Sequence, residues 1–189
     1  IYMTQRDSDT SIWGLIWSVV LILTPVLLLV GGLVGMTGSV SPFVTVASDS
    51  MEPNIETGET VVLVETSGSV VLAPDTITTA ADARREPDPE TSFGAPGDVI
   101  HFDPVTADRP IVHRVQFEVS EGDEWVHRID ADPQYETNHT CASAEHCPAP
   151  YDGYITAGDN NPTYDQLDGY QIVRDEQING VVRFRVPLL

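Results

Sequence analysis

One uncharged apolar segment constrains the fold of this chain more than any other feature. The stretch 12–36 contains 25 consecutive residues without a charge. At about 1.5 Å per residue, a helix of this length covers roughly 37 Å, which is enough to cross a hydrocarbon core with some tilt. Trp13 and Trp17 lie near one end, as interfacial aromatic residues do. We therefore predict one transmembrane helix, with a kink at Pro25.

Two other interpretations of this segment fit less well. A signal peptide has a shorter apolar region and a small-residue cleavage site, and a buried soluble helix usually carries a polar stripe. Arg6 is the only basic residue before the segment, and the next one is Arg84. This small bias keeps the N-terminus inside. The sequence thus predicts a single-pass protein of the cell membrane, with a flank at 1–11, an anchor at 12–37 and an extracytoplasmic domain at 38–189.

The charge composition excludes one class of partner. The chain has 29 acidic residues against nine arginines and no lysine, which gives a net charge of −20. Such an excess of negative charge repels phosphates, so we expect no nucleic acid partner. Salt at high concentration would screen the self-repulsion of this chain. We therefore hypothesise a halophilic source.

Beyond residue 38 the pattern favours a mainly β domain without internal repeats. Short β-branched runs alternate with Gly, Pro and Asp, and no helical periodicity stands out. Residues 67–96 and 131–153 are polar, and we expect them to be inserted loops. The expected strands are 41–48, 59–66, 97–104, 110–119, 124–130, 152–158, 170–178 and 180–189.

Ser50, in the turn before Pro53, is the candidate nucleophile. A serine hydroxyl is a poor nucleophile and needs a base. Lysine serves in many membrane serine proteases of this layout, but this chain has none, so a histidine must act. His113 within PIVHRV is the favoured base because its apolar flanks would fix it on a strand. His127 within WVHRID is the main alternative, and the remaining histidines are His101, His139 and His146.

The segment GDNNPTYDQ offers carboxylates that could orient the base. Asp159 and Asp165 lie six residues apart in it. A carboxylate holds the tautomer of a catalytic histidine and stabilises the imidazolium. Gly, Asp, Asn and Pro also make ordinary turns, so this segment alone would not indicate a catalytic site.

The two cysteines, Cys141 and Cys147, lie in the second expected loop. In an external domain they most simply form a disulfide. A zinc site that includes His139 and His146 is the alternative, although the spacing is cramped for tetrahedral coordination. We expect no metal and no cofactor.

Four short motifs occur in order directly after the anchor. They are SDSMEP (48–53), GDVIHF (97–102), PIVHRV (110–115) and GDNN with a later Asp (158–165). Together they resemble type I signal peptidases of the archaeal and endoplasmic-reticulum branch, and 180–189 is similar to the closing strand of that family. The bacterial branch uses a Ser–Lys dyad, whereas this branch has histidine in place of lysine. The resemblance implies a signal-peptidase-like β-barrel or coiled β-sheet.

The resemblance also implies roles for the candidate residues. Ser50 would attack the scissile carbonyl and its backbone N–H would help to bind the oxyanion. His113 would act as general base and then protonate the leaving amine. Asp165 would orient His113, and Asp159 would support the site through its turn. Ser48 would add a hydroxyl to the oxyanion site.

The pocket and the substrate follow from the same resemblance. Met51 would pack under the serine and shape the floor of the pocket, and Val44 and Val46 would line it. Signal peptidases cut secreted precursors after a small-residue motif, which suits an extended peptide paired with a strand edge. The expected partners are secretory precursors, membrane lipid and the secretion machinery.

Three other functions remain open at this point. The first is a related serine peptidase with a dedicated substrate. The second is an inert membrane-tethered β module for binding, in which Ser50, His113 and Asp165 need not meet. The third is an inactive homologue that serves as a subunit.

Overall fold

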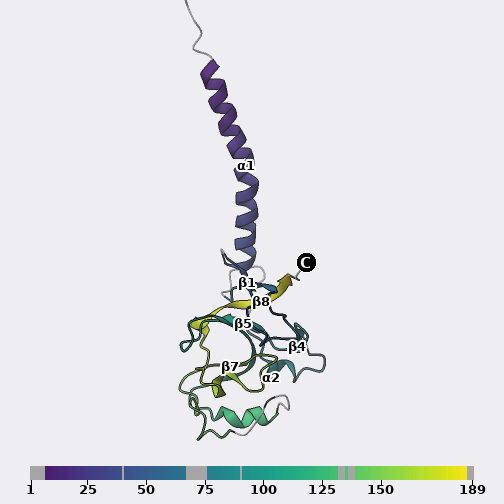
Figure 1. Cartoon of the computed structure of the whole chain (residues 1–189), viewed down its shortest axis with the longest axis vertical. Helices are drawn as coiled ribbons and strands as arrows, with labels where there is room; N and C mark the ends of the chain where they lie inside the picture. The colour runs from purple at the N-terminus through teal and green to yellow at the C-terminus, as the bar shows by residue number, and fades with distance from the viewer. Residues whose placement is uncertain are drawn as a thin grey trace, which may run out of the picture.

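A long helix is joined to a mostly antiparallel β body in the computed structural model, which describes residues 7–39, 41–66, 76–89, 91–131, 135 and 139–186 (Figure 1). The helix α1 (Asp7–Thr37) projects away from the body and contains Pro25. Its part from Ile12 to Thr37 is long and apolar enough to cross a membrane, by length and composition. The helix changes direction part-way along its length, as expected for an internal proline.

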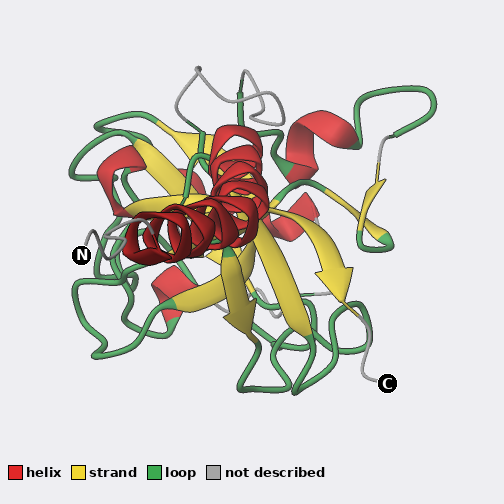
Figure 2. Ribbon diagram, turned by 90° about the horizontal axis from the view of Figure 1, so that it is seen from above, coloured by secondary structure: helices red, strands yellow, loops and turns green. Residues whose placement is uncertain are grey.

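The β body is built on one six-stranded antiparallel sheet, whose strands fan out beneath the helix in the view from above (Figure 2). The strand order is β1-β2-β8-β5-β6-β7. The bounds are β1 (Phe43–Thr45), β2 (Thr60–Val64), β5 (Val99–Phe102), β6 (Ile111–Val119), β7 (Gly153–Ala157) and β8 (Ile178–Val186). A separate hairpin pairs β3 (Thr91–Ser92) with β4 (Ala95–Pro96).

The prediction of a mainly β domain after one N-terminal helix is confirmed, but the expected barrel does not close. Among the described strands, β1 pairs only with β2, and β7 pairs only with β6. One isolated bridge, between Tyr154 and Val173, continues β7 on its other side. The sheet therefore keeps two open edges.

The expected strand at 124–130 is wrong. This segment forms the 3-10 helix η1 (Trp125–Ala131). Trp125, Val126 and Ile129 are buried in a cluster with Phe117. Their spacing places them on one side of a helical turn, and a short β-branched run does not distinguish this from a strand.

The expected strand at 170–178 is also wrong for most of its length. Val173 makes a single bridge, and the chain then enters the 3-10 helix η3 (Asp175–Gln177). The side chain of Gln177 accepts a hydrogen bond from the Arg174 N–H at 3.0 Å, which stabilises the start of this turn. Strand β8 begins directly afterwards.

The segment 67–96 contains structure where a loop was expected. Within its described part, α2 (Ala80–Ala83) is capped by Thr79, whose side chain accepts from the Asp82 N–H. Ala80 and Ala83 are buried, and α2 packs on β6. The hairpin β3–β4 ends the segment. The small size of these alanines lets the helix approach the sheet closely.

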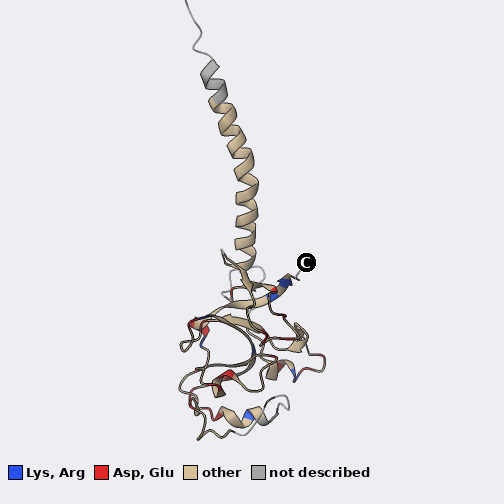
Figure 3. Ribbon diagram, viewed as in Figure 1, with Lys and Arg blue, Asp and Glu red and all other residues tan. Residues whose placement is uncertain are grey.

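The charged residues lie on the β body and leave the apolar helix free of them over its described side chains (Figure 3). The structure thus consists of an apolar helix and an acidic β body that carries the charged side chains described.

Candidate active site

Ser50 lies in a tight turn that is anchored in the core. The N–H groups of Asn54 and Ile55 both donate to the Met51 carbonyl oxygen, at 3.0 and 2.9 Å. Met51 and Ile55 are fully buried in a cluster that includes Val46. The core thus holds the backbone of this turn in place.

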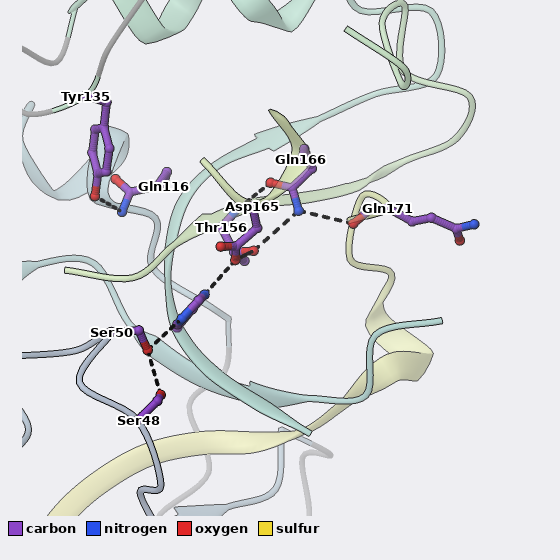
Figure 4. A network of polar contacts seen from close by, with 9 residues as sticks. Ser48, Ser50, Gln116, Tyr135, Thr156, Asp165, Gln166 and Gln171 are labelled. Carbon is purple, nitrogen blue, oxygen red and sulfur yellow. Dashed lines mark hydrogen bonds and ion pairs between the residues drawn. The ribbon is translucent and has the colours of Figure 1, made fainter. Parts of the chain in front are cut away.

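His113 connects Ser50 to Asp165. Its Nε2 lies 2.9 Å from the Ser50 Oγ, and its Nδ1 lies 2.7 Å from the Asp165 Oδ2 (Figure 4). His113 comes from β6, and Asp165 opens the 3-10 helix η2 (Asp165–Leu167). The structure therefore brings together three residues that are separated by 63 and 52 positions in the chain.

The chemistry of these contacts follows from their donors and acceptors. An ionised carboxylate only accepts, so the proton on the His113 ring belongs on Nδ1. Nε2 then accepts from the Ser50 hydroxyl and is able to take its proton. His113 is 6% exposed and Asp165 is 1% exposed, so little water screens this pair.

Asp159 does not contact His113 and instead pairs with the neighbouring Arg114. The Arg114 Nε and Nη2 donate to the two Asp159 oxygens at 2.7 and 2.6 Å, and the Asn54 Nδ2 donates at 2.8 Å. Arg114 is 1% exposed. A bidentate pair of this kind is strong and directional. The pair ties the turn at 158–161 to β6, and the Asn54 hydrogen bond ties the same turn to the turn that carries Ser50.

Arg114 is a site residue that the sequence reasoning missed. Its Nη1 donates to the carbonyl oxygens of Ser92, Ala95 and Gly97 at 2.8, 3.1 and 2.6 Å. Arg114 therefore holds the β3–β4 hairpin as well as Asp159. The signal in the sequence was an arginine within the apolar run PIVHRV, where a charged side chain needs a buried partner.

The turn after β7 also binds the Ser50 turn through its backbone. The Asn160 N–H donates to the Ser50 carbonyl oxygen at 2.8 Å, and the Asn160 Nδ2 donates to the Asp49 carbonyl oxygen at 3.2 Å. A Cβ atom on Gly158 would lie 2.6 Å from the Ser50 carbonyl oxygen. Glycine is needed there because no side chain fits between the two turns.

Ser48 lies beside the candidate nucleophile. Its Oγ is 3.1 Å from the Ser50 Oγ. The backbone N–H of Ser50 donates no hydrogen bond to any other described residue. The Ser50 N–H is therefore free to donate to an oxygen atom that develops charge near Ser50. The Ser48 hydroxyl donates to the Ser50 Oγ here, because the Ser50 proton is given to His113, and it would turn to reach such an oxygen atom.

A groove of about 520 Å³ opens at Ser50 and His113. Val44 and Val46 line it. Met51 is not among its lining residues and is fully buried below the serine turn. Its side chain points into the core and supports the serine turn from below.

Two titratable side chains in the groove have shifted pKa values. Burial lowers the pKa of His101, against the opposing effect of the Asp103 charge. Burial and the negative charge of Asp165 raise the pKa of Asp168, and His139 partly offsets this. Near neutral pH His101 is therefore uncharged and adds no positive charge beside His113.

The other histidines do not share the contacts of His113. His127 is exposed on η1 and makes no hydrogen bond to Ser50 or Asp165. Cys141 and Cys147 form a disulfide with an S–S distance of 2.03 Å, so neither thiolate is free to bind zinc. No group of metal-binding side chains occurs among the residues that the structure describes.

Comparison with known proteins adds no functional information. No protein-family model matches the chain, and no curated protein sequence gives a significant match. The function must therefore be argued from the geometry around Ser50.

Proposed function

We propose that this protein is a membrane-anchored serine endopeptidase that removes signal peptides from secreted precursors. The observation that carries the proposal is the continuous contact from Ser50 through His113 to Asp165, at 2.9 and 2.7 Å. A buried carboxylate, an imidazole and a hydroxyl in this order form the arrangement that activates serine for acyl transfer.

The proposed reaction uses each group in turn. The Ser50 Oγ bonds to the scissile carbonyl carbon while its proton moves to the His113 Nε2. The oxyanion that forms accepts hydrogen bonds from the Ser50 N–H and the Ser48 hydroxyl. When the peptide C–N bond breaks, His113 returns the proton to the leaving amine. Water, activated by the same imidazole, then hydrolyses the acyl-enzyme.

The groove supports a peptide substrate with small side chains. Val44 and Val46 line it together with Ser50 and supply apolar side chains for contact with a substrate. Strand β1 pairs only with β2 among the described strands, so its outer edge is open to an added strand. An extended peptide that pairs there would present alternate side chains to the groove. These features fit cleavage after a small-residue motif.

The helix and its surroundings support a site at the membrane surface. The Glu65 N–H donates to the carbonyl oxygen of Thr37, the last residue of α1, so the sheet is tied to the end of the helix. Phe43 and Phe184 lie across neighbouring strands on either side of Val62, and both are about half exposed. We propose that this apolar row faces lipid and keeps Ser50 near emerging precursors.

The meeting of Ser50, His113 and Asp165 favours an enzyme over an inert binding module or an inactive subunit. A serine peptidase with a dedicated substrate would use the same three residues. Cleavage of a generic secretory precursor, rather than of one particular protein, separates these two enzymes.

The test is a precursor-processing assay with the full chain in liposomes. We expect Ser50→Ala and His113→Ala each to lower the cleavage rate by at least about 1000-fold, because each removes a member of the reacting set. His127→Ala is the matched control and should cleave at the rate of the wild type. Unfolding curves of all variants would show that they fold. If His127→Ala abolishes cleavage and His113→Ala does not, the assignment of the base is wrong.

A further inference from the structure

Thr156 contacts the carboxylate of Asp165, which in turn contacts His113. It belongs to β7, opposite Val115 on β6, and it is fully buried. Its Oγ1 is 2.6 Å from the Asp165 Oδ2, which is the same oxygen that lies 2.7 Å from the His113 Nδ1. One carboxylate oxygen therefore has two partners, one on each side.

The direction of the Thr156 hydrogen bond follows from its partner. An ionised carboxylate oxygen can only accept, so the single hydroxyl proton of Thr156 points at Asp165. The bond is charge-assisted and short. The torsion that rotates an aspartate carboxylate is broad, so one hydrogen bond to His113 would not hold the group in one orientation. A second donor to the same oxygen, the Thr156 hydroxyl, fixes the orientation of the carboxylate.

Gln166 in turn fixes the orientation of Thr156. Its Oε1 accepts from the Thr156 backbone N–H at 2.9 Å. Its Nε2 donates to the Gln171 carbonyl oxygen at 3.1 Å and lies 3.4 Å from the Thr156 Oγ1. Gln166 is 1% exposed. Gln166 therefore contacts both the backbone and the hydroxyl oxygen of Thr156, and the Thr156 hydroxyl proton is donated to Asp165 (Figure 4).

We propose that Thr156 is a positioning residue that acts through Asp165. It holds the carboxylate in the orientation that accepts the His113 Nδ1–H, which keeps Nε2 free for the Ser50 proton. The catalytic part of this inference rests on the proposed function. Its structural part, the control of the His113–Asp165 hydrogen bond by Thr156, does not depend on cleavage.

The first experiment compares Thr156→Val, Thr156→Ser and Thr163→Val in the full chain. Valine keeps the shape of threonine and removes the hydroxyl, whereas serine keeps the hydroxyl. We expect Thr156→Val to lower kcat about tenfold with KM unchanged, because Thr156 does not line the groove. Thr156→Ser should restore most of the activity.

Thr163→Val is the matched control. The Thr163 Oγ1 is buried and has no hydrogen-bond partner among the described residues, although it lies two positions before Asp165. Its loss should leave kcat unchanged. An equal fall of kcat in Thr156→Val and Thr163→Val, or no fall in either, overturns the catalytic role.

The second experiment is independent of activity. In detergent, ¹⁵N-histidine labelling follows the Nδ1–H resonance of His113, assigned by its loss in His113→Gln. A hydrogen bond to a fixed carboxylate moves this resonance downfield. We expect it to move upfield and broaden in Thr156→Val, and to stay in place in Thr156→Ser and Thr163→Val.

The two experiments test the positioning role of Thr156 and the proposed peptidase function separately. An unchanged resonance in Thr156→Val overturns the positioning role, whatever the activity. If the wild type cleaves no precursor but the resonance responds as expected, the proposed function fails and the role of Thr156 stands. Should Thr156→Val not fold, Thr156→Ala removes the same hydroxyl without adding bulk, and the same comparison with Thr156→Ser applies.

Discussion

Asp159 and Asp165 show how two acids in one short segment acquire different tasks. Asp165 accepts from His113, and Asp159 accepts from Arg114. His113 and Arg114 are adjacent on one strand, so their side chains point to opposite faces of the sheet. The segment 158–165 follows Ala157, which pairs with Arg114, and one of its acids contacts each of the two side chains. The alternation of the strand therefore separates the acid that contacts His113 from the acid that pairs with Arg114.

Replacing Asp165 should mainly lower kcat, whereas replacing Asp159 should mainly lower the free energy of unfolding. We expect Asp165→Ala to lower kcat about 10⁴-fold, because His113 loses the group that sets its tautomer. Asp159→Ala should lower activity less but cost about 3–5 kcal/mol of unfolding free energy, since it leaves the buried Arg114 charge unpaired. Cleavage kinetics and urea unfolding of both variants check this. A larger loss of activity in Asp159→Ala with intact stability would reverse the two roles.

The segment between Cys141 and Cys147 packs on the hydrophobic cluster that contains Trp125 and Phe117. Cys147 packs against that cluster, and the Trp125 Nε1–H donates to the His146 carbonyl oxygen at 2.7 Å. The covalent bond closes a loop with a sequence separation of 6. It thus secures a polar segment onto η1, outside the contacts of Ser50 and His113.

Replacing both cysteines should therefore affect stability rather than chemistry. For a loop this short, we expect the double variant Cys141→Ser/Cys147→Ser to lose about 2 kcal/mol of unfolding free energy, with the cleavage rate unchanged. Chemical unfolding followed by tryptophan fluorescence measures the loss. A thiol reductant should shift the wild type by a similar amount and leave the double variant unaffected. A wild type that is insensitive to reductant would argue against the bond.

At the scale of the whole molecule, an apolar helix is joined to a strongly acidic body. The net charge is −20, and among the side chains that the structure describes the charged groups lie on the β body. Like charges at this density oppose the compact state, and salt screens them. The acidity thus predicts a fold that depends on ionic strength, and the helix is long and apolar enough to cross a membrane.

We expect the unfolding midpoint to rise as potassium chloride is increased from about 0.1 M to about 1 M, because the Debye length falls from roughly 10 to 3 Å over this range. Thermal unfolding in detergent measures the midpoint. Sorbitol at matched osmolarity is the control, since it leaves the charges unscreened. A midpoint that does not rise with salt would refute the halophilic hypothesis.

The sequence by itself indicated the long helix, the mainly β body and the candidate residues Ser50, His113 and Asp165. The apolar run required one long helix, and alternation placed His113 on a strand. The absence of lysine made a histidine the expected base for Ser50. These conclusions depend on composition and on contacts between near neighbours in the chain, which a sequence displays directly.

Only the tertiary structure decided which of these residues meet. It assigned Asp165 rather than Asp159 to His113, revealed Arg114 and Thr156, and turned residues 124–130 into a helix. Strand pairing and packing bring these groups together across many positions of the chain, and short apolar runs satisfy a helix or a strand equally well until a core selects one. The partners of a buried polar group are set by that packing, because every buried donor and acceptor must be satisfied there.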